Sequence, residues 1–63
     1  MSEDILFEGK VLRIREEEDL KDGWVELHGV RIRVNLSLVP EVQVGDYVLV
    51  QGRMALSRIE NNV

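Results

Sequence analysis

The chain has 63 residues, no cysteine and a formal net charge of −4 at pH 7. The lack of cysteine excludes disulfides, thiolate metal sites and a cysteine nucleophile. The acidic balance argues against general attraction to nucleic acid phosphates. Apolar runs reach at most four residues and the first residues are acidic, so the sequence predicts neither a membrane span nor a secretory signal. We therefore expect a cytoplasmic protein.

The first predicted strand covers Ile5–Arg15. Gly9 lies inside it, and a glycine within a strand indicates a bulge or a sharp bend. The next segment, REEEDLKDG at 15–23, is strongly charged and ends in Asp22-Gly23, which is typical of a loop. Its acidic residues lack the alternation and the glycine of a calcium-binding loop. We interpret this segment as a solvated loop rather than a cation site.

Residues 24–36 show the clearest β pattern. Two runs, Trp24–Leu27 and Val30–Leu36, alternate between apolar and polar residues on either side of His28-Gly29. A tight reversal needs positive φ at both central positions, which glycine adopts freely and histidine tolerates. This turn sets the register, and the predicted pairs are Leu27 with Val30, Glu26 with Arg31, Val25 with Ile32, and Trp24 with Arg33. We expect Val25 and Ile32 to face a barrel interior, with the arginines outside.

The last third of the chain predicts two more strands. Gly45-Asp46 indicates a turn formed through the Asp46 side chain, followed by a fourth strand at Tyr47–Gln51. Gly52-Arg53 indicates a break or bulge before a fifth strand at Met54–Ile59. Five short strands without a convincing helix favour a closed barrel, because closure removes exposed sheet edges.

The predicted fold is therefore all-β, a small five-stranded OB-like barrel. We expect residues 1–63 to form a single domain, with residues 1–4 and 60–63 frayed. An SH3-like barrel is the alternative.

Catalytic chemistry is nearly absent from the sequence. His28 is the only histidine, and its place in a hairpin turn indicates a solvated side chain rather than a general base or a metal ligand. No glycine-rich phosphate loop is present. We predict a protein that is not an enzyme and that has no catalytic residue, no metal site and no cofactor.

A few residues offer a possible contact face for nucleic acid. Trp24 with Arg13, Arg31 and Arg33 fits the stacking and phosphate contacts that OB barrels make with single strands. The competing interpretation is a cation–π contact between Trp24 and Arg33 that only stabilises the sheet. We favour the latter, because the chain has one Trp, one Tyr and one Phe. An RNA-binding module similar to bacterial translation initiation factor one is the alternative function.

One long stretch carries a more specific signal. GVRIRVNLSLVPEVQVGDYVLVQGRMALSRIE, at 29–60, resembles the HypC/HupF family of hydrogenase maturation chaperones, and Gly9-Lys10-Val11 is similar to the family's first strand. The resemblance implies an OB-like barrel that binds proteins, namely the HypD maturation factor and the precursor of the large subunit of nickel–iron hydrogenase. It also implies a part in carrying the iron fragment with its cyanide and carbon monoxide ligands.

The chain departs from the family pattern where the family handles iron. The family begins with Met-Cys, whereas Ser2 stands here, and Gln51 stands where a histidine is common. The resemblance therefore implies fold and protein binding without the cysteine chemistry. The expected partner contacts are Ile5, Leu6, Phe7, Gln51 and Met54. Without the resemblance, we expect Phe7 to pack in the core rather than to lie at a partner surface.

Overall fold

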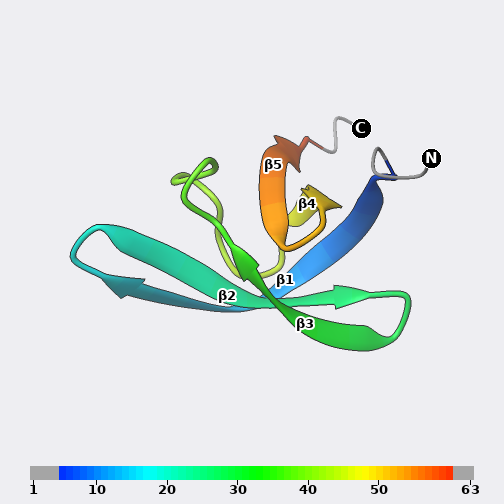
Figure 1. Cartoon of the computed structure of the whole chain (residues 1–63), viewed down its shortest axis with the longest axis horizontal. Helices are drawn as coiled ribbons and strands as arrows, with labels where there is room; N and C mark the ends of the chain where they lie inside the picture. Colours follow the sequence, from blue (N-terminus) through cyan, green and yellow to red (C-terminus); the bar gives the residue numbers. More distant parts are fainter. Residues whose placement is uncertain (1–4, 61–63) are drawn as a thin grey trace.

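The computed structural model describes residues 5–60, which form a closed barrel (Figure 1). Its strands are β1 (Phe7–Glu17), β2 (Leu20–Leu27), β3 (Val30–Asn35), β4 (Tyr47–Gln51) and β5 (Met54–Ile59). The order around the barrel is β1-β2-β3-β5-β4, and β4 pairs back onto β1. All neighbouring strands are antiparallel except β3 and β5, which meet in parallel at Asn35 and Met54.

This arrangement confirms the predicted all-β, OB-like barrel. Within the described residues no helix is long and apolar enough to cross a membrane. Fraying was expected at residues 1–4 and 60–63, and all of these except Glu60 lie outside the described part of the chain.

The β2–β3 hairpin forms as the pattern predicts. His28 and Gly29 have φ angles of 53° and 84°, so both turn positions are in the left-handed region that a tight hairpin requires. The four predicted cross-strand pairs are all present. Val25 is fully buried and Ile32 packs against the core, whereas Val30 is 58% exposed because it lies at the hairpin's outer end.

The predicted loop at 15–23 is wrong, because this segment is a second hairpin. β1 continues to Glu17 and β2 begins at Leu20, so only two residues turn the chain, of which Glu18 has a φ of 47°. Opposite charges face each other across the ladder: Arg15 Nη2 lies 3.2 Å from Asp22 Oδ2, and Lys21 Nζ lies 3.4 Å from Glu16 Oε2. The charges that suggested a loop are cross-strand partners, and the hairpin projects beyond the barrel (Figure 1).

The bulge of β1 lies near Gly9 but not at it. The register shifts between Val11 and Arg13, so that Leu12 is the extra residue opposite β2. Gly9 instead permits close packing: a Cβ there would lie 2.3 Å from Leu27 Cδ2. Beside the bulge, β1 also approaches Gly23 closely, where a Cβ would lie 2.0 Å from the Arg13 carbonyl oxygen.

The core is aliphatic, and three of its members come from the connection between β3 and β4. These are Leu36, Val39 and Val42, each at most 3% exposed. The three side chains are three positions apart because the backbone makes two consecutive tight turns. In these turns the Val39 amide donates to the Leu36 carbonyl and the Val42 amide donates to the Val39 carbonyl, both at 3.0 Å. The connection packs these side chains with the buried residues of the strands, which are Val11, Val25, Val34, Val48, Val50 and Ala55.

Candidate functional site

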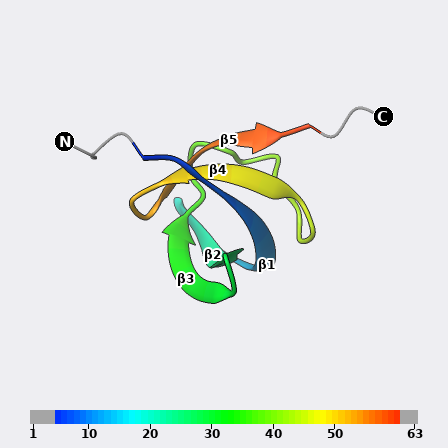
Figure 2. The ribbon, with the colours of Figure 1, turned by 90° about the vertical axis from the view of Figure 1, so that its right-hand side faces the viewer.

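The five predicted partner contacts come from two separate parts of the chain. Phe7 pairs with Val50 across β1 and β4, and Gln51 pairs with Met54 at the β4–β5 turn. The start of β1 therefore runs beside the end of β4, as both views show (Figures 1 and 2). We call this region the apolar end, defined by Ile5, Leu6, Phe7, Gln51 and Met54.

The apolar end exposes three consecutive apolar side chains. Ile5 is 48% exposed, Leu6 47% and Phe7 40%. The core placement of Phe7 is therefore wrong: its ring meets the His28 ring edge-on, with 5.9 Å between centroids. Gln51 and Met54 beside them are half-buried. Phe7 is the first residue of β1, so its ring lies at the rim of the barrel, whereas Gly9 and Val11 further along the strand are buried.

The predicted nucleic acid residues also gather, on the outer face of the β1–β2–β3 sheet. Arg13, Trp24 and Arg33 form one cross-strand row, and Lys10, Glu26 and Arg31 form the next. Arg15, Asp22 and Asn35 form the third. We call this surface the cationic face, defined by Lys10, Arg13, Arg15, Trp24, Arg31 and Arg33.

Trp24 is the centre of the cationic face. The Arg33 guanidinium carbon lies 5.3 Å from the centroid of its ring, which is the cross-strand contact that the pattern favoured. Two shallow hollows flank the indole. One is lined by Leu12, Arg13, Trp24 and Arg31, and the other by Arg13 and Trp24 together with Arg15, Asp22 and Arg33.

Sequence reasoning missed Lys10 as a member of this face. The bulge at Leu12 is what keeps Arg13 and Arg15 pointing outward, and Ile14 between them packs against the core. Nothing in the local pattern of β1 marks the bulge, and the close approach of the Arg13 carbonyl to Gly23 appears only when β1 pairs with β2.

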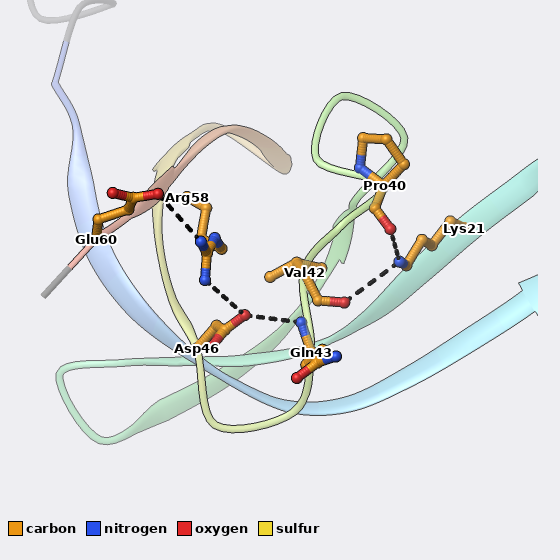
Figure 3. A network of polar contacts seen from close by, with 7 residues as sticks. All are labelled: Lys21, Pro40, Val42, Gln43, Asp46, Arg58 and Glu60. Atoms are coloured by element: carbon orange, nitrogen blue, oxygen red, sulfur yellow. Dashed lines mark hydrogen bonds and ion pairs between the residues drawn. The ribbon is translucent and has the colours of Figure 1, made fainter.

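The Gly45-Asp46 motif has a structural role, as predicted for Asp46. Asp46 Oδ2 accepts a hydrogen bond of 2.9 Å from the Gln43 amide, and it lies 3.6 Å from Arg58 Nη1 (Figure 3). Arg58 Nη2 in turn donates to Glu60 Oε2 at 3.2 Å. In the same view Lys21 Nζ donates to the carbonyls of Pro40 and Val42 and so ties the connection to β2.

No metal centre emerges from the described residues. Between residues 5 and 60, no three His, Asp or Glu side chains come together as a metal site would require. His28 is exposed in its turn. The apolar end and the cationic face are the two candidate functional surfaces.

The fold places the chain among the small OB-like barrels, which meet ligands through their outer strands and loops. The model of the HupF/HypC family matches residues 8–63, so the chain belongs to that family, a family of hydrogenase maturation chaperones. This confirms the resemblance of the 29–60 segment. The comparisons with curated proteins and with solved structures found no match.

Proposed function

We propose that this protein is a HypC-like accessory chaperone of the cytoplasm. It binds a HypD-like maturation factor or the precursor of a hydrogenase large subunit, and it makes and breaks no covalent bond itself. The family match over residues 8–63 is the observation that carries this proposal. The apolar end supplies the docking surface, because it is the place where three neighbouring apolar side chains remain exposed beside the β4–β5 turn.

Burying the side chains of the apolar end against a partner yields a modest binding free energy, which suits a chaperone that binds reversibly. Full burial of a leucine or isoleucine side chain is worth about 1.5–3 kcal/mol. Ile5 and Leu6 are roughly half exposed, so docking them adds about 1 kcal/mol each. Together they contribute about 2 kcal/mol, or roughly 30-fold in Kd.

The residues present do not fit an iron carrier. The chain has no cysteine, so no thiolate can hold the iron fragment that the family handles as cargo. Gln51 and Met54 offer an amide and a thioether at the apolar end instead. The proposed role is therefore to hold a partner protein.

The test is a binding titration with purified partners from the same organism. The double substitution Ile5→Ser/Leu6→Ser should weaken binding about 30-fold, because it removes the apolar area that docking would bury. Both residues precede β1, so the change leaves the strands intact. Leu38→Ser/Val44→Ser is the matched control, since these side chains are 58% and 61% exposed in the β3–β4 connection. Equal weakening by both double variants, or no binding of either partner, would refute the proposal.

A further inference from the structure

The cationic face has a charge opposite in sign to that of the whole protein. Its three rows hold five cationic side chains and two carboxylates, Asp22 and Glu26, which gives a local charge of +3 on a chain of net charge −4. Local cations concentrated on one sheet attract anions even when the molecule as a whole is acidic.

Among the residues that the structure describes, most of these cations make no ion pair, although Glu26 faces Lys10 and Arg31 across the ladder. Within residues 5–60, Arg15 pairs with Asp22, whereas Lys10, Arg13 and Arg31 make no ion pair. Arg33 lies over Trp24. The bulge places Arg13 between the two hollows, so that guanidinium groups line both sides of an indole that is 39% exposed.

We propose that the cationic face binds a short acidic segment of a partner protein in an extended conformation. Arg31 and Arg33 are two residues apart on β3, which separates them by about 6.7 Å along the strand. Alternate side chains of an extended peptide have the same spacing, so two carboxylates of such a segment match the two arginines. Arginine binds carboxylates through paired hydrogen bonds, and Trp24 provides apolar surface between them.

A nucleic acid strand fits this face less well. Glu17, Glu18 and Asp19 are exposed at the tip of the β1–β2 hairpin, beyond the row of Arg15 and Asp22. A long polyanion that follows β1 and β2 would meet these carboxylates, whereas a short acidic segment ends before them. Binders of single strands also stack successive bases on several aromatic side chains, whereas this face offers Trp24 at its centre and Tyr47 at its edge, opposite Lys10.

This inference does not rest on the hydrogenase role or on the apolar end, so either proposal can fail without the other. The probe is a synthetic peptide of four Glu-Ser repeats with blocked ends. Trp24 is the only tryptophan, so its fluorescence reports on the centre of the face, and amide chemical shifts in β1, β2 and β3 locate the contact. Low salt favours the interaction between exposed charges.

Arg31→Glu should weaken peptide binding at least tenfold. The matched control is Arg53→Glu, which makes the same change of net charge in the exposed β4–β5 turn and should change Kd less than twofold. Circular dichroism confirms that both variants remain folded. The proposal is overturned by the absence of saturable binding, by equal weakening in both variants, or by tighter binding of an oligouridylate of similar charge, which would assign the face to nucleic acid.

Discussion

Gly23→Ala tests the geometry on which the cationic face depends. A Cβ at position 23 would lie 2.0 Å from the Arg13 carbonyl oxygen and 3.1 Å from Leu36 Cδ1. The oxygen belongs to the backbone of the β1 bulge, so it cannot move aside as a flexible side chain does. We expect the substitution to push β1 away from β2 at the position where Arg13 faces Trp24.

The expected loss of stability is large for a chain of this size. Overpacking a well-packed site costs about 1–3 kcal/mol, and a disrupted backbone hydrogen bond adds about 1 kcal/mol. We expect a loss of roughly 3 kcal/mol, against a total of roughly 3–9 kcal/mol at 0.05–0.15 kcal/mol per residue. One kcal/mol shifts Tm by about 4–8 °C in small domains, so Tm should fall by roughly 10–25 °C.

Thermal and urea unfolding followed by circular dichroism measure this loss. Gly29→Ala is the control, because position 29 has a φ of 84° but no atom within 4 Å of the new Cβ. Its cost comes from the backbone conformation alone and should be about 1 kcal/mol. If Gly23→Ala lowers Tm no more than Gly29→Ala does, the steric explanation of the bulge is wrong.

Three further substitutions test other parts of the fold by the same unfolding measurements. Leu36→Ala should cost about 2–5 kcal/mol because it removes a fully buried side chain of the β3–β4 connection, and a loss below 1 kcal/mol would contradict its place in the core. Asp46→Ala should cost about 1 kcal/mol by leaving the Gln43 amide without its acceptor, whereas Glu41→Ala, exposed in the same connection, should change little. His28→Gly should be neutral or slightly stabilising because the φ of 53° suits glycine, and a loss above 1 kcal/mol would show that the contact with Phe7 matters more than the turn.

Prediction of the two surfaces from sequence succeeded only in part. Trp24, Arg31 and Arg33 alternate within one hairpin whose register follows from its turn, so their common face is a local property. Arg13 joins them through the bulge, and Lys10 was not foreseen. Phe7 pairs with Val50 near the end of β4, more than 40 positions along the chain. Only the resemblance to the family suggested that the start of β1 and the β4–β5 turn share one surface.

The sequence alone determined the elements whose causes are local. His28-Gly29 and Gly45-Asp46 set turns through φ preferences and a side-chain hydrogen bond, and the period of two marked the strands beside them. The tertiary structure decided the rest, because the role of these residues depends on which strands pair with each other. Charges at 15–22 become a ladder only when the strands face each other. The Arg13 carbonyl approaches Gly23 only in that pairing, and Phe7 lies exposed because it is the first residue of β1, at the rim of the barrel.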